Sequence, residues 1–171
     1  MAESLNLTAD TKEGIYREIY PQLECILGGE TDMIANMANL SAVLMAAFGH
    51  LWIGFYIVRP RGEKEELVLG PFQGPLACTR ITYGRGVCGT AWKNGETLIV
   101  PVVDRFPGHI ACSSLSRSEI VVPIYSRSSV EGNDGVSKVA AVLDIDSIDI
   151  EKFDVVDRFW LEKIVKLICI N

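Results

Sequence analysis

The sequence has no excess of basic residues, no convincing membrane-spanning segment and no closely spaced pair of cysteines. Among its 171 residues, 16 Lys and Arg stand against 22 Asp and Glu, which gives a net charge of −6. Proteins that bind nucleic acids normally carry a basic face, so this balance argues against a nucleic-acid partner. The longest uncharged segment, residues 33–58, is interrupted by Asn, Gly and His. A buried helix followed by a strand explains that segment better than a membrane span does.

The N-terminal residues 1–14 lack a basic segment followed by an apolar stretch, which predicts that no signal peptide is present. We therefore expect a cytoplasmic protein whose five cysteines start out reduced. The odd number of cysteines also argues against a fully paired disulfide framework. An apolar fraction of 49% and a charged fraction of 22% are typical of a globular chain, and the length predicts a single domain over residues 1–171.

The hydrophobic pattern predicts an α+β fold. Apolar residues recur at helical spacing over residues 8–28 and 31–48. A last helix is expected after a cap at Asp154, with Val155, Phe159, Ile164 and Leu167 facing inward. Residues 51–58 and 65–73 read as a hairpin, and further strands are expected at 97–103, 119–126 and 138–147. Because turns and loops, rather than long helices, join most of these strands, we expect an antiparallel sheet with helices packed on one face.

A glycine-rich segment at residues 84–89, GRGVCG, matches the pattern G-x-G-x-x-G of dinucleotide-binding proteins. No clear apolar strand precedes it, and the helix expected after it is short, so the match does not favour a dinucleotide site. The sequence also lacks the G-x-x-x-x-G-K-[ST] motif of nucleotide-binding loops. We therefore expect no bound cofactor.

Three of the five cysteines, Cys78, Cys88 and Cys112, fall in glycine-broken connecting segments, where they add little to a core. Cys25 and Cys169 fall in helical patterns and are expected to be small buried apolar residues. Loops position functional groups on a scaffold, so the first three are candidates for chemistry, with a buried thiol beneath a loop as the plain alternative.

Two kinds of chemistry would use these thiols. Cys78, Cys88, His109 and Cys112 could bind zinc, although the close C-x-x-C pairs typical of structural zinc sites are missing. Redox chemistry fits better, because a cysteine oxidised to a sulfenic acid needs a second thiol with which to condense. The residues leave the nucleophile open: His109 precedes Cys112 by three positions, whereas Cys88 would lie in the first turn of a short helix, where backbone amides would favour its thiolate.

Three carboxylates stand out. Glu119 begins a predicted strand, and Asp144 and Asp146 are two positions apart in another, so both point to one face. If they are buried, their repulsion would keep one of them protonated near neutral pH, and that acid could donate a proton to a polarised oxygen. A strand end that caps the next loop is the plain alternative. Trp52 and Tyr56 also share a face, with core packing as their plain alternative.

Three segments, residues 70–92, 106–124 and 142–154, closely resemble the free methionine-(R)-sulfoxide reductases, which are single-domain proteins of the GAF fold. The resemblance runs from about residue 51 to residue 165. It implies a ligand pocket covered by loops that carry cysteines, on the sheet face opposite the helices. It also implies reduction of the R epimer of free methionine sulfoxide, with thioredoxin as the reductant. A homodimer would be consistent with the GAF fold.

The resemblance also implies roles for single residues. Cys112 is expected to be the nucleophile, Cys78 the resolving cysteine and Cys88 the alternate. Glu119 and Asp146 are candidates for the proton donor, with Asp144 a further one. The expected substrate-binding residues are Trp52, Tyr56, Glu119, Asp144 and Asp146. A GAF domain that binds a small molecule without catalysis is the alternative function, although it would not need three loop thiols.

Overall fold

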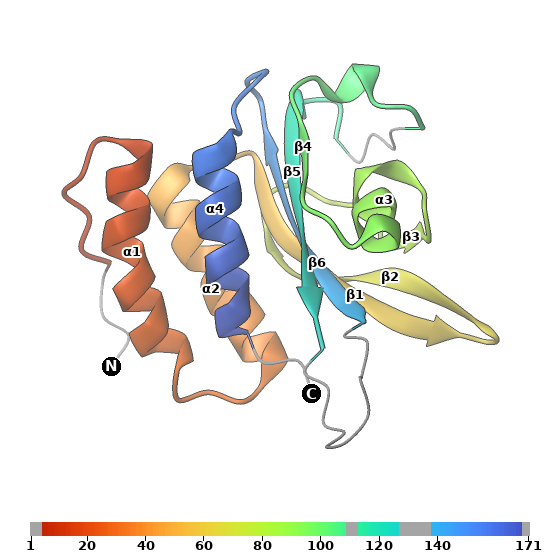
Figure 1. The fold of residues 1–171 in the computed structure, drawn as a ribbon, viewed down its shortest axis with the longest axis horizontal. Helices are drawn as coiled ribbons and strands as arrows, with labels where there is room; N and C mark the ends of the chain where they lie inside the picture. Colours follow the sequence, from red (N-terminus) through yellow and green to blue (C-terminus); the bar gives the residue numbers. More distant parts are fainter. Residues whose placement is uncertain (1–4, 109–112, 127–137, 169–171) are drawn as a thin grey trace.

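The computed structural model describes residues 5–108, 113–126 and 138–168. Its centre is a six-stranded antiparallel sheet in the order β3-β2-β1-β6-β5-β4 (Figure 1). The strands are β1 (Trp52–Arg61), β2 (Lys64–Gln73), β3 (Arg80–Thr82), β4 (Leu98–Val100), β5 (Ser118–Tyr125) and β6 (Val139–Ser147). The two strands that carry the candidate carboxylates, β5 and β6, are direct neighbours in the sheet.

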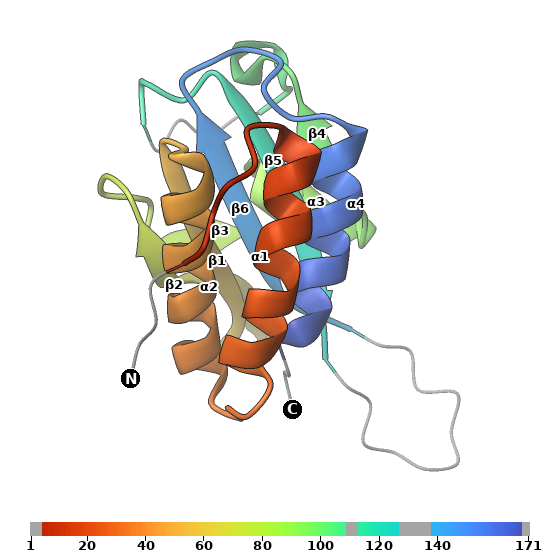
Figure 2. The ribbon, with the colours of Figure 1, turned by 90° about the vertical axis from the view of Figure 1, so that its left-hand side faces the viewer.

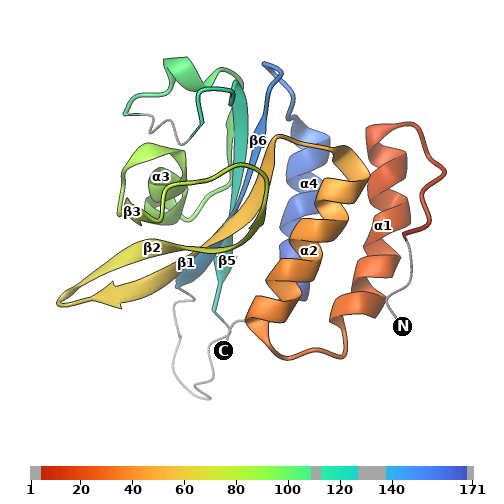
Figure 3. The ribbon, with the colours of Figure 1, turned by 180° about the vertical axis from the view of Figure 1, so that it is seen from behind.

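Helices cover the two faces of the sheet unequally. Figure 1 and, from behind, Figure 3 show three helices packed on one face: α1 (Lys12–Leu27), α2 (Met33–Phe48) and α4 (Val155–Ile164). The opposite face carries the short helix α3 (Gly86–Asn94) and β3, with the short 3-10 helix η1 (Val103–Arg105) at one end of the sheet; a second 3-10 helix, η2 (Val165–Leu167), follows α4. The predicted α+β architecture, with an antiparallel sheet and a helical layer, is confirmed.

Polar side chains fix where the helices begin and hold two of them together. The Asp154 side chain caps α4 as expected and forms a reciprocal capping box with Asp157. Asp157 is buried, and it accepts hydrogen bonds from Lys12 (2.5 Å) and from the Tyr16 hydroxyl (3.0 Å), both on α1. Figure 2 shows α1 and α4 side by side on the helical face of the sheet. The capping box therefore also joins the two helices.

Strand alternation separates two apolar layers. Along β1, Ile53 and Phe55 pack in the core beneath the helices, whereas Trp52 and Tyr56 belong to a second apolar cluster on the other face. This second cluster also includes residues of α3, and it forms the floor on which the candidate site is built.

The inward face of α4 differs from the prediction. Val155 and Phe159 are 75% and 60% exposed, while the buried residues are Asp157, Trp160, Leu161 and Ile164. These four follow the i, i+3, i+4, i+7 spacing of one helical face, so the prediction of an inward side chain is confirmed for Ile164 and wrong for Val155 and Phe159. Within the described ranges, no helix combines the length and apolarity needed to span a membrane.

Candidate functional site

The register of three neighbouring strands places an aromatic ring and the candidate carboxylates side by side. Asp146 on β6 lies opposite Trp52 on β1 and opposite Glu119 on β5. Asp144 lies two residues along β6 from Asp146 and therefore points to the same face. Asp146 thus stands at the centre of a row that runs across the sheet, from the tryptophan on one side to the glutamate on the other.

The Trp52 ring can lie over the sheet because Gly54 has no side chain. A Cβ atom at Gly54 would come within 2.5 Å of Trp52 Cη2 and within 2.4 Å of Phe72 Cβ. The Trp52 ring stacks on Phe72 and on Tyr56, with ring centroids 5.4 Å and 5.9 Å apart. The resulting aromatic wall forms one side of a hollow in the sheet face.

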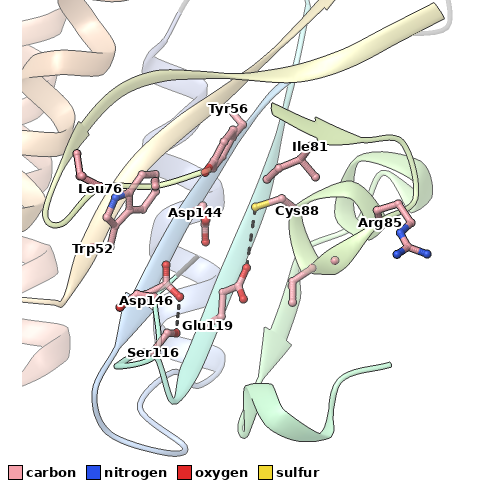
Figure 4. A pocket seen from close by; sticks show the side chains of 14 residues that line it. Trp52, Tyr56, Leu76, Ile81, Arg85, Cys88, Ser116, Glu119, Asp144 and Asp146 are labelled. Atoms are coloured by element: carbon pink, nitrogen blue, oxygen red, sulfur yellow. Dashed lines mark hydrogen bonds between the residues drawn. The ribbon is translucent and has the colours of Figure 1, made fainter. Parts of the chain in front are cut away.

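This hollow contains about 540 Å³ of space between the side chains, a volume that includes the open solvent at its mouth. Its walls come from β1, β5, β6, the start of α3 and the loops around Leu76 and Ser116, and Figure 4 shows their side chains converging on it. The lining residues are Trp52, Tyr56, Leu76, Ala77, Ile81, Arg85, Gly86, Val87, Cys88, Ser113, Ser116, Glu119, Asp144 and Asp146.

Helix α3 brings Cys88 into this pocket. A Cβ atom at Gly89 would lie 2.6 Å from the Thr82 carbonyl oxygen, so only glycine allows the helix to pack this closely against the end of β3. Cys88, in the first turn, is 4% exposed, and its thiol donates a hydrogen bond to Glu119 Oε1 over 3.9 Å (Figure 4). The glycines of residues 84–89 thus have local structural roles: Gly84 and Gly86 adopt positive φ angles, and Gly89 permits the close helix contact.

The three carboxylates have few partners for their charge. Asp146 accepts a hydrogen bond from the Ser116 hydroxyl, and Glu119 accepts the one from Cys88. Asp144 Oδ1 is buried and has no hydrogen-bond partner among the described residues. None of the Lys and Arg residues that form ion pairs in the described part of the chain is paired with any of the three. The pocket therefore offers negative charge without a bound cation of its own.

Burial shifts the titration of these groups. It raises the pKa of both Glu119 and Asp144 well above its usual range, and the negative charges of neighbouring carboxylates add to the effect. Burial also raises the pKa of Asp146, from its ordinary value of 3.8 to about 6, although the Ser116 hydrogen bond lowers it. Burial and mutual repulsion therefore make all three carboxyl groups of the pocket hold their protons more tightly than they would in water.

The expectation that the helix start favours a Cys88 thiolate is wrong. Cys88 does lie in the first turn of α3, as predicted. Burial, and then the charges of Asp144 and Glu119, nevertheless raise the pKa of its thiol well above the ordinary value. The desolvation and repulsion outweigh the favourable field of a helix only nine residues long.

The segment that bears Cys78 is held from beneath by the aromatic wall. Trp52 Nε1 donates a hydrogen bond to the Pro75 carbonyl oxygen over 3.2 Å, and the Tyr56 hydroxyl donates one to the Cys78 carbonyl oxygen over 3.0 Å. Cys78 is half-buried and disulfide-bonded. Trp52 and Tyr56 are therefore more than core residues, because each carries a polar atom that fixes the loop.

The sequence also makes predictions for three other cysteines and for His109. Cys112 and His109, on which the prediction of the nucleophile depends, lie outside the described residues, as does Cys169. Cys25 is a free thiol and is exposed, so its predicted burial is wrong. The buried stripe of α1 runs through Leu23 and Leu27, and Cys25 lies between them on the outer side of the helix.

Sequence reasoning missed Ser116 and Arg85. Ser116 is 7% exposed and binds Asp146, while the exposed Arg85 precedes α3 at the edge of the pocket. No spacing or motif distinguishes them; the only signal for Ser116 is its place shortly before Glu119. One potential metal-ligand set appears among the described residues, in which ligand atoms of Cys88, Glu119 and Asp144 all lie within 4.8 Å of one another.

Comparisons with known proteins extend these observations. The family model described as GAF domain matches residues 22–170. GAF domain-containing protein A of Dictyostelium discoideum is 51% identical over 98% of this chain and 99% of its own length. Free methionine-R-sulfoxide reductase of Saccharomyces cerevisiae is 43% identical over 98% of this chain and 91% of its own. A solved structure of free methionine-R-sulfoxide reductase from Neisseria meningitidis, in complex with its substrate, superimposes with a TM-score of 0.86 at 51% identity, covering 96% of this chain and 92% of that one.

Proposed function

Because the chain belongs to the GAF-domain family of free methionine-R-sulfoxide reductases and is an enzyme of that kind, we propose that its loop cysteines and its carboxylate pocket together carry out the reduction. The substrate is the R epimer of free methionine sulfoxide. The observation that carries this proposal is the convergence of Cys88, Glu119, Asp144 and Asp146 in one pocket, beneath a loop that bears the disulfide-bonded Cys78.

The carboxylates suit the amino group of a free amino acid. A substrate ammonium has three donors, and the pocket offers the unpartnered Asp144 Oδ1 and the oxygens of Asp146 and Glu119 as acceptors. A methionine sulfoxide within a peptide chain has an amide in place of this ammonium, and it would leave the buried charge unpaired. The stacked rings of Trp52 and Tyr56 would receive the S-methyl group.

The chemical step transfers the sulfoxide oxygen to a cysteine. The thiolate of Cys112 attacks the sulfoxide sulfur while Glu119 or Asp146 protonates the oxygen, and methionine leaves as the cysteine becomes a sulfenic acid. The raised pKa of Glu119, caused by burial and neighbouring carboxylates, supports its role as the proton donor. Cys88 is the alternate nucleophile, but the raised pKa of its buried thiol favours Cys112.

Recycling returns the enzyme to its reduced state. The thiol of Cys78 condenses with the sulfenic acid, a disulfide forms and water leaves; thioredoxin then reduces this disulfide by thiol exchange. The presence of Cys78 in a disulfide, while Cys25 and Cys88 are free thiols, supports this choice of resolving cysteine.

A coupled assay tests the proposal. Oxidation of NADPH by thioredoxin reductase and thioredoxin is measured with the R epimer, the S epimer and an R-sulfoxide within a peptide, and only the free R epimer should be consumed. In single turnovers without thioredoxin, Cys112→Ser should form no methionine, Cys78→Ser should form one equivalent, and Cys25→Ser should behave as wild type. A burst from Cys112→Ser together with an inactive Cys88→Ser would assign the nucleophile to Cys88 instead. Binding of the sulfoxide without turnover of either epimer would favour a non-catalytic binding module.

A further inference from the structure

Three buried ligand atoms of two chemical kinds converge on the inner wall of the pocket. Cys88 supplies a free thiol, and Glu119 and Asp144 supply carboxylate oxygens, with all three ligand atoms within 4.8 Å of one another. The three side chains come from α3, β5 and β6, so separate elements of the fold bring them together. Each is less than a tenth exposed. A mixed sulfur and oxygen set of this kind is a potential binding site for a metal cation.

One of these atoms is unpaired. Asp144 Oδ1 is buried without a hydrogen-bond partner among the described residues, and leaving such an oxygen unsatisfied is costly. The neighbouring contact is also long, since Cys88 Sγ and Glu119 Oε1 are 3.9 Å apart. Asp144 therefore has an oxygen available to a ligand at this wall of the pocket, which is expected where a cation completes a site.

The distances fit a small tetrahedral ion. With zinc–sulfur bonds of about 2.3 Å and zinc–oxygen bonds of about 2.0–2.2 Å, a sulfur and an oxygen ligand of one zinc ion lie roughly 3.5 Å apart. The observed distance of 3.9 Å between Cys88 Sγ and Glu119 Oε1 is close to that value. A small rotation of the carboxylate groups would bring the ligand atoms to the distance that zinc requires. Magnesium and calcium prefer six or more oxygen ligands, whereas a thiolate favours zinc and cadmium.

We propose that this pocket is an inhibitory site for a thiophilic divalent cation of the zinc class, held by Cys88 Sγ, Glu119 and Asp144. The ion occupies the space near Asp144 that the substrate ammonium needs, so that metal and substrate exclude each other. Binding of the ion depends only on the three ligand residues, while the inhibition rests on the proposed function. The set differs from the zinc hypothesis based on Cys78, Cys88, His109 and Cys112, because it shares only Cys88 with that hypothesis and takes its other two ligands from the sheet.

The binding experiment uses the full chain without reductant, so that Cys78 stays in its disulfide and does not compete as a thiol. After dialysis against a chelator and its removal, Zn²⁺ is titrated by calorimetry, and Cd²⁺ is followed by the ultraviolet absorption of its thiolate bond. We expect one ion per chain. Cys88→Ser and Asp144→Asn should each weaken binding by more than the roughly 10- to 100-fold that loss of an outer-shell partner costs. Cys25→Ser removes the exposed free thiol on α1 and should bind as wild type does.

The results decide between the site and its absence. Lack of Zn²⁺ binding by the wild-type chain, or a cadmium–thiolate absorption that persists in Cys88→Ser, overturns the proposal. Asp144→Asn keeps the shape of its side chain and tests the site even if Cys88→Ser does not fold. In the reductase assay Zn²⁺ should raise the KM for the sulfoxide without lowering kcat, and addition of a chelator should restore the original KM. A KM that Zn²⁺ leaves unchanged overturns the proposed competition between metal and substrate. The two proposals can also fail separately. If the metal-free protein reduces neither epimer but still binds Zn²⁺ with the expected pattern among the variants, the metal site is supported and the proposed function is refuted.

Discussion

Replacing Asp146 with Asn should make the protein more stable and less active. Burial raises the pKa of Asp146 from 3.8 to about 6, so the folded state disfavours the charge that this residue carries at neutral pH. Asn is similar in shape, and its amide oxygen can still accept the hydrogen bond of Ser116. The substitution removes the buried charge and also its repulsion of Asp144 and Glu119.

The magnitude and its pH dependence follow from this shift. A carboxyl whose folded-state pKa is raised holds its proton more tightly when folded than when unfolded, so wild-type stability falls as pH rises from about 4 to about 6. Two pKa units correspond to about 3 kcal/mol as an upper bound, and we expect about 1–3 kcal/mol. For a chain of this size that is a rise in Tm of about 3–10 °C for Asp146→Asn at pH values above 7, and little change near pH 4.

Thermal unfolding followed by circular dichroism at several pH values measures this difference. The control is Asp149→Asn, which makes the same substitution in the exposed loop that follows β6 and should change stability by no more than about 0.5 kcal/mol. In the reductase assay, Asp146→Asn should raise KM because the substrate ammonium loses a charged partner. A variant that loses as much stability at pH 8 as at pH 4 would show that the fold does not disfavour the Asp146 charge.

Three further predictions concern other parts of the structure. Tyr56→Phe removes the hydrogen bond to the Cys78 carbonyl, which is worth about 0.5–1.5 kcal/mol. In rapid-quench measurements this variant should form the disulfide severalfold more slowly, and this step should be slowed more than methionine release. Tyr125→Phe, which loses a hydrogen bond to the Gly95 carbonyl, is the control and should not slow disulfide formation. Gly89→Ala should lower the free energy of unfolding by about 1–3 kcal/mol in denaturant titrations, because the new Cβ would lie 2.6 Å from the Thr82 carbonyl oxygen. Gly29→Ala is the control: its Cβ would meet no atom within 4 Å, so it should not destabilise the protein. Burial, with smaller effects of Lys152 and Lys12, lowers the pKa of His50 to about 4, so stability should fall as pH drops below about 6.5; His50→Phe should flatten this acid limb of the Tm profile.

Much of the site could be predicted because strand alternation is a local property. The two-residue period alone places Asp144 and Asp146 on one face, and Trp52 and Tyr56 on one face. The period does not say which strands are neighbours or how they are aligned. The alignment of Asp146 with both Trp52 and Glu119 depends on two pairings of β6. One is with β5, the strand just before it in the sequence, and the other is with β1, from which four strands separate it.

Other features could not be predicted because they depend on burial. The position of Cys88 in a first helical turn was visible in the sequence, but its surroundings of buried carboxylates were not, and they reverse the expected effect on its thiol. The phase of α4 likewise depends on the contact of Asp157 with Lys12 and Tyr16, which places a charged residue on the inward face. Ser116 lies in a loop, where no periodicity reports which side chains turn inward.

The aromatic wall links the size of the pocket to the placement of the Cys78 loop. Trp52 and Tyr56 set the space left for a small molecule, and the same two side chains hold the Pro75 and Cys78 carbonyls. An engineer who replaces Trp52 with a smaller residue to admit a bulkier sulfoxide would also release the loop that bears Cys78, the proposed resolving cysteine. Substrate range and turnover are therefore tied together in this scaffold, and a broader specificity would require a new anchor for the loop.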